Sequence, residues 1–288
     1  RARERAQSPK RRVRPIVVVL AVALAALLAG STSDVAVSGR AETRIVPPIN
    51  RMMYRPDDRD RRIADAKDVL VAGCMAGQGL DYTPQVEHVT GDEALAALRP
   101  FGLESLENIG AEPLPPEPVR DERYARALFG DPDRRMVAHG ERLEISWPAT
   151  GCQADAEHRL LGDQRQRASE LRLRLYDGER DAKEQLDRDR DFVAINVSWR
   201  KCMNRRGIDA PDPADLLSAL PADTNLATDP AARADLQCKQ ETGYLHTAYA
   251  RLAFLQQQWL DAHGELIGEW LALRQRQDTV ARQVLGSS

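Results

Sequence analysis

Residues 231–285, AARADLQCKQETGYLHTAYARLAFLQQQWLDAHGELIGEWLALRQRQDTVARQVL, contain no proline and carry a single apolar stripe. The stripe consists of residues mostly three or four apart: Leu245, Tyr249, Leu252, Leu255, Trp259, Leu266, Trp270, Leu273, Val280 and Val284. This spacing predicts one long helix, about 80 Å if straight, which Gly243, Gly264 or Gly268 would bend. A helix of that length would overhang the core, so we expect it to pair in a coiled-coil manner.

The chain before this stretch is also helical. Helices are predicted over 153–161 and 165–176, with a break near Asp177-Gly178, and a further stripe runs from Ala182 to Met203. A proline-rich loop follows, with Pro211, Pro213, Pro221 and Pro230. The sequence therefore predicts a C-terminal helical half over 165–288, with its long helix at about 231–285.

The N-terminal half, 56–164, mixes short elements with loops. Four prolines within 113–118 exclude regular structure there. The expected elements are an amphipathic helix from Asp57 to Gly79, short helices at 92–98 and 121–129, and one small β-hairpin within 135–147. The predicted fold class is mainly α.

The first 30 residues have the organisation of an export signal. Residues 1–15 carry seven basic side chains and one acid, and residues 16–30 are apolar or small throughout. Fifteen residues span about 22 Å of helix, which is short of the ~30 Å hydrocarbon core. We therefore expect a signal peptide over 1–30 and a flexible lead-in over 31–55, with an uncleaved membrane anchor as the alternative.

The end of the predicted signal indicates the location of the protein and whether it carries a lipid. Leu28-Ala29-Gly30-Ser31 has the form of a lipoprotein signal in which Ser31 replaces the cysteine that would carry the lipid. We expect an extracytoplasmic protein, secreted or associated with the cell envelope, that is not lipidated.

Charge patterning excludes two classes of partner. The 288-residue chain has 41 basic and 44 acidic residues, and removing residues 1–30 leaves 34 basic and 43 acidic, a net charge of −9. An acidic surface repels phosphate backbones and anionic lipids. We expect no nucleic acid as a partner, and membrane contact only through an uncleaved anchor.

All four cysteines follow the predicted signal. An even number of cysteines in an exported chain implies disulfides, and four cysteines allow three connectivities. We expect one disulfide within each half, Cys74–Cys152 and Cys202–Cys238.

One internal repeat, C-M-x-x-x-G-[LI]-D, ends a predicted helix in each half. It is CMAGQGLD at 74–81 and CMNRRGID at 202–209. The pattern predicts a helix cap, with glycine in the left-handed C′ position, an apolar residue at C″ and methionine at C3 beneath it. The predicted cap residues are Met75, Gly79 and Leu80 in the first copy, and Met203, Gly207 and Ile208 in the second.

The repeat and its surroundings resemble a known family. The segments are RRIADAKDVLVAGCMAGQGLDYTP (61–84), WRKCMNRRGIDAPDP (199–213) and ARADLQCKQETGY (232–244). Together they resemble a family of actinobacterial exported proteins, many of them lipoproteins, with repeated Cys-Met-x3-Gly motifs. The resemblance implies an extracytoplasmic location and no particular activity, and Ser31 departs from the lipoprotein members.

No catalytic motif stands out in the sequence. None of the five histidines lies in H-E-x-x-H, and G-x-S-x-G, P-loop and dinucleotide fingerprints are absent. The acid pairs Asp155/Glu157 and Asp187/Asp189 are expected on solvated surface, because residues two apart on a helix do not face each other. We therefore predict no catalytic residue, no metal ligand and no cofactor.

The functional prediction is accordingly a broad one. We expect a non-catalytic binding or accessory protein of the envelope or extracellular space, which contacts a protein or envelope component through its long C-terminal helix. The first alternative is a secreted hydrolase, in which residues such as Glu157, His158 and Asp235 would converge in one pocket. The second is an extracytoplasmic copper protein that binds Cu(I) through its cysteine–methionine pairs.

Overall fold

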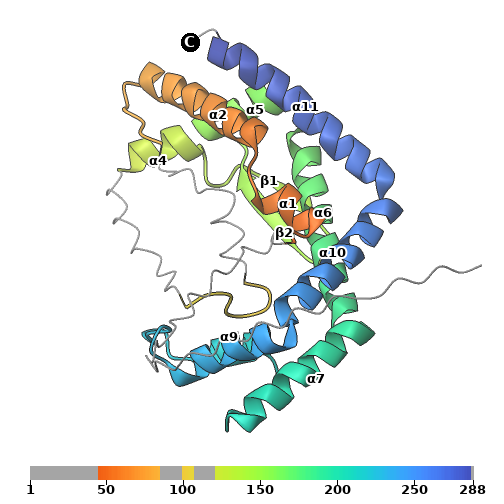
Figure 1. The fold of residues 1–288 in the computed structure, drawn as a ribbon. Helices are drawn as coiled ribbons and strands as arrows, with labels where there is room; N and C mark the ends of the chain where they lie inside the picture. Colours follow the sequence, from red (N-terminus) through yellow and green to blue (C-terminus); the bar gives the residue numbers. More distant parts are fainter. Residues whose placement is uncertain (1–44, 85–98, 107–120, 287–288) are drawn as a thin grey trace, which may run out of the picture. The chain divides into compact units, whose positions relative to one another are not determined.

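The computed structural model describes residues 45–84, 99–106 and 121–286, within a compact unit, Thr43–Ser288. These residues form a mainly α fold, as predicted, with one two-stranded hairpin (Figure 1). The elements are α1 (Pro48–Tyr54), α2 (Asp58–Gly77), α4 (Glu122–Phe129), β1 (Arg135–His139), β2 (Glu144–Pro148), α5 (Cys152–Leu161), η1 (Gly162–Gln164), α6 (Arg165–Leu186), α7 (Arg190–Arg205), α8 (Pro213–Ala219), α9 (Pro230–Thr242), α10 (Tyr244–Ala262) and α11 (Gly264–Gly286). The predicted signal peptide at 1–30, the helix at 92–98 and the prolines at 113–118 lie outside the described residues.

The lead-in predicted to be flexible over 31–55 contains a short helix, α1, and the prediction is wrong for this part. Pro48 occupies the first helical turn, where its missing N–H costs nothing. Ile49 is fully buried, and its backbone N–H donates to Gln256 Oε1 on α10 at 2.9 Å. A seven-residue helix is unstable alone, so these tertiary contacts hold it in place.

The segment 231–285 is helical, but it forms three helices and not one straight element about 80 Å long. The breaks fall at Gly243 and at His263-Gly264, so two of the three glycines predicted to bend the helix are confirmed. α9 ends at Gly243, which has a left-handed φ of 66°. α10 ends at His263, whose Nδ1 lies 2.8 Å from the carbonyl oxygen of Trp259. The long C-terminal helix is α11, which packs along α2 (Figure 1). Its apolar face therefore meets another helix of the same chain.

α6 is continuous, and the break predicted near Asp177-Gly178 is wrong. A Cβ on Gly178 would lie only 2.5 Å from ring atoms of Trp259 on α10. The glycine therefore permits close helix packing and does not end the helix. The chain turns later, after Leu186, inside the apolar stripe predicted to run without a break from Ala182 to Met203. Asp189 caps α7 by accepting from the Phe192 backbone N–H at 3.0 Å.

The predicted hairpin is present as β1 and β2, antiparallel, with Val137 opposite Ser146. It is attached to α6, because the Glu141 backbone N–H donates to Asp177 Oδ2 at 2.9 Å. This attachment holds β2, and with it Trp147, in a fixed position relative to α6.

Each disulfide lies in an apolar cluster of its own. The larger cluster includes Phe101, Phe192, Trp199, Cys202, Cys238 and Tyr244. The second includes Val71, Met75, Leu128, Cys152 and Ala156. A third cluster connects α2, α5 and α11 through Ile63, Ala66, Leu160, Ala281 and Val284. Among the described helices, none is both long enough and apolar enough to cross a bilayer.

Candidate functional site

Both copies of the repeat end their helices with the same hydrogen bonds. At the end of α2, the Leu80 N–H donates to the Met75 carbonyl at 3.0 Å and the Gly79 N–H donates to the Ala76 carbonyl at 2.9 Å. This is the Schellman motif, with Gly79 at a φ of 70°. The equivalent bonds at the end of α7 join Ile208 to Met203 at 3.1 Å and Gly207 to Asn204 at 3.0 Å.

The first disulfide joins α2 to α5, two helices that also line the groove described below. Cys74 near the end of α2 is bonded to Cys152, the first residue of α5, with a Cα–Cα distance of 5.6 Å. Gln78 covers this bond, with its Nε2 3.2 Å from the Cys152 Sγ. The disulfide therefore sets the spacing of α2 and α5 at one end.

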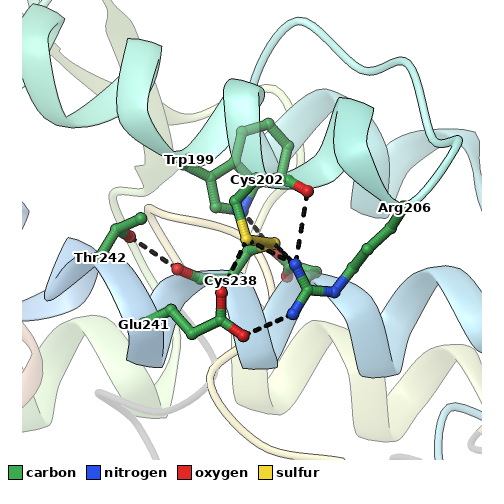
Figure 2. The surroundings of a disulfide bond; sticks show 7 residues. Trp199, Cys202, Arg206, Cys238, Glu241 and Thr242 are labelled. Atoms are coloured by element: carbon green, nitrogen blue, oxygen red, sulfur yellow. Dashed lines mark hydrogen bonds and ion pairs between the residues drawn. A yellow bond between two sulfur atoms is a disulfide. The ribbon is translucent and has the colours of Figure 1, made fainter.

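The second disulfide, Cys202–Cys238, joins α7 to α9 with a Cα–Cα distance of 5.7 Å. Figure 2 shows Arg206 reaching over this bond, with its Nη1 2.8 Å from the Cys202 Sγ and 3.2 Å from the Cys238 Sγ, while its other amino group pairs with Glu241. Arg206 occupies the same place in its repeat as Gln78. All four cysteines are oxidised here, so none offers the thiolate that Cu(I) prefers.

A buried charged network lies beside the second disulfide. Asp235 accepts from Trp199 Nε1 at 2.9 Å and from Lys239 Nζ at 2.7 Å, and Lys239 also donates to the Leu103 carbonyl. Burial raises the pKa of Asp235 and lowers the pKa of Lys239, while their ion pair opposes both shifts. Both charged groups have hydrogen-bond partners inside the protein, so we interpret this network as a structural part of the core.

Glu157, His158 and Asp235 do not converge. Asp235 is buried together with Lys239, and His158 is exposed to solvent. Glu157 lines a separate groove on another part of the molecule. Within the described ranges, no group of three or more histidine, cysteine or acidic side chains is placed to hold a metal ion.

The candidate functional site is this groove, a hollow of about 450 Å³ between α2, α5, α6, α11 and β2. Its walls are largely apolar, and two tryptophans, Trp147 and Trp270, lie in them. The charged side chains that line it are Asp60, Lys67, Glu157, Arg165, Arg172 and Arg274.

Glu157 is the centre of one set of ion pairs in the groove. Its two oxygens lie 2.8 Å from Lys67 Nζ and 2.9 Å from Arg165 Nη2. Burial alone would raise the pKa of Glu157, but the two cations outweigh it and hold the pKa below its usual value. The carboxylate is therefore a fixed negative charge at neutral pH. Its predicted place on solvated surface is wrong, because α2 and α6 pack on either side of it.

Arginine supplies the rest of the charge. Arg274 on α11 is paired with Asp60 on α2. Arg172 on α6 is exposed and makes no hydrogen bond or ion pair with the described residues. Arg165 is buried with a side chain 9% exposed, and its Nε has no hydrogen-bond partner among those residues.

The sequence signals for this groove were weak. Trp270 belongs to the apolar stripe, packs against the cluster of Ile49, Leu175 and Trp259, and also lines the groove. On α6, Arg165 and Arg172 are seven residues apart, which places them on one helix face. That spacing was the available signal, but neither arginine forms part of a recognised motif.

Comparison of the chain with protein-family models, with curated proteins and with solved structures finds no match. The function of this chain is therefore inferred from its site.

Proposed function

We propose that this protein is an exported binding protein that holds a ligand in the groove without transforming it. The observation that carries the proposal is the groove itself: its charges come from paired or permanently ionised groups, and its remaining lining is largely apolar. Glu157, with its lowered pKa, is suited to fixing the position of Lys67 and Arg165 and is poorly suited to proton transfer near neutral pH.

The covalent framework supports a binding role. The Cys74–Cys152 disulfide holds α2 against α5, and α11 packs on both helices. A groove whose walls are fixed before the ligand arrives loses less conformational entropy on binding.

Two features support export. The basic and apolar organisation of residues 1–30 is that of a secretory signal, and two disulfides are typical of proteins in oxidising extracytoplasmic compartments. The proposed membership in the actinobacterial exported family, carried by its repeated motif, agrees with this location.

The test is native and denaturing mass spectrometry of the protein recovered from the extracytoplasmic fraction. We expect a chain that begins after the signal, carries two disulfides and no lipid, and retains a small molecule. Ala168→Trp, which fills the groove from α6, should abolish retention. Ala272→Trp, at an exposed position on α11 outside the groove, should leave it unchanged.

Two results would contradict the proposal. One is that Ala168→Trp retains the same molecule as the unaltered chain. The other is hydrolysis of p-nitrophenyl acetate that Ala168→Trp abolishes and Ala272→Trp preserves, which would favour the secreted hydrolase.

A further inference from the structure

The groove has a local excess of positive charge on an otherwise acidic protein. Four cationic side chains line it against two carboxylates, Asp60 and Glu157. Both carboxylates are already bound by cations of the groove. About two positive charges are therefore left without a counter-charge among the lining residues.

Half of this excess lies where α6 faces α11, because Arg172 has no counter-charge there while Arg274 is paired with Asp60. The other half lies at Lys67 and Arg165, which share Glu157. Arg172, Arg274 and the carboxylate paired with Arg274, Asp60, line both the groove and an adjoining hollow of about 300 Å³, so they lie at the junction of the two. Trp270 lies at the same junction, and the Arg274 guanidinium is 5.8 Å from the centroid of its ring. Arginine is the side chain best suited to hold the oxygens of an anion in two parallel hydrogen bonds. Arg172 can offer both, whereas Arg274 already donates through Nη1 to Gln277 and through Nη2 to Asp60 and adds mainly its charge.

A second observation points to a polar contact elsewhere in the groove, at the start of α6. The buried Arg165 guanidinium uses Nη2 to bind Glu157, and its Nε is unpaired among the described residues. A buried donor without an acceptor is costly, and such groups are rare unless a ligand or water completes them. Arg165 is thus a second polar contact of the groove, seven residues before Arg172 on α6.

Between these polar points, the walls are apolar. The apolar lining side chains that remain open to solvent there are the exposed Ile145 and the half-buried Trp147 and Trp270. A small inorganic anion would leave the exposed part of these side chains in contact with water. An organic ligand would cover them and gain from the apolar area removed from water.

Building on the proposed function, we infer that the ligand is an organic phosphate monoester with an aromatic or apolar body. Its phosphate lies between Arg172 and Arg274, and its body follows the apolar walls past Trp270. A phosphate monoester carries close to two negative charges at pH 7, which equals the excess summed over the whole groove, whereas a carboxylate carries one.

The experiment is isothermal titration calorimetry of the protein recovered from the extracytoplasmic fraction, with phenyl phosphate as the probe. Three further compounds separate the contributions to binding. Inorganic phosphate lacks the aromatic body, benzoate has only one negative charge, and phenol is uncharged. We expect phenyl phosphate to bind at least tenfold more tightly than each of the three. Arg172→Gln should weaken phenyl phosphate binding at least tenfold.

Arg180→Gln is the matched control, because Arg180 is an exposed arginine of the same helix that does not line the groove. It should change the affinity less than twofold. Equal effects of the two substitutions would overturn the inference, since they would indicate attraction to net charge alone. Equal affinity for benzoate or for inorganic phosphate, or no binding of phenyl phosphate, would overturn it as well.

The two proposals fail in different ways. A retained molecule that is lost in Ala168→Trp but kept in Arg172→Gln would preserve the binding function and overturn the phosphate assignment. Retention that neither substitution affects would overturn both.

Discussion

Gly178 of α6 lies directly against the indole of Trp259 of α10, so closely that a Cβ at position 178 would be 2.5 Å from the Cδ2 and Cε2 atoms of the ring. This contact allows α10 to cross α6 at a distance that any other residue would forbid. Trp259 also packs in the cluster that holds Ile49 of α1. The glycine therefore determines how three helices meet.

Gly178→Ala should destabilise the protein by about 1–3 kcal/mol, because overpacking outweighs the better helix propensity of alanine. Gly73→Ala is the matched control: Gly73 is also inside a helix, α2, and nothing lies within 4 Å of its added Cβ. It should stabilise by about 0.5–1 kcal/mol. Urea unfolding monitored by circular dichroism measures both, and changes of the same sign would refute the packing argument.

The two disulfides should contribute similar stability but different function. Their cysteines are 78 and 36 residues apart, so loop-closure entropy predicts losses of about 4.5 and about 4 kcal/mol when each pair is replaced by alanine. Only the Cys74–Cys152 pair joins helices that line the groove. Its removal should weaken phenyl phosphate binding measured at 10 °C, whereas removal of Cys202–Cys238 should not. Equal loss of binding in both variants would contradict this division.

Lys239→Met should cost about 3–5 kcal/mol of unfolding free energy, because it leaves the Asp235 carboxylate buried with no cation. The double variant Asp235→Leu/Lys239→Met should recover part of this loss, since no buried charge remains. A double-mutant cycle by urea unfolding gives the coupling. Additive effects of the two single substitutions would show that the pair is not coupled.

Glu157→Gln should destabilise the protein by about 1–3 kcal/mol at pH 7, where it removes the partner shared by Lys67 and Arg165. The folded state lowers the pKa of Glu157, so its contribution is fully present above the unfolded-state pKa of about 4.3 and is lost as the pH falls through the lower folded-state value. Unfolding free energies at pH 7 and at pH 2.5 test this. A difference between the two proteins that does not shrink at pH 2.5 would be the contrary result.

Local features of this fold are determined by short stretches of sequence. The Cys-Met-x3-Gly repeat predicts the end of α2 and of α7, because the cap is made entirely by residues three to five apart. The amphipathic spacing of α2, the alternation of the hairpin and the mainly α class are equally local. The disulfide pairs within each half are also those that the structure contains.

Tertiary contacts decided the rest. Gly178 has the local signature of a helix break, and only the ring of Trp259 explains why the helix continues. α1 exists because Gln256, more than 200 positions away, accepts its backbone N–H groups. The groove is assembled from α2, α5, α6, α11 and β2, so no window of sequence contains it. Caps and stripes depend on neighbours along the chain, whereas a binding site depends on which side chains packing brings together.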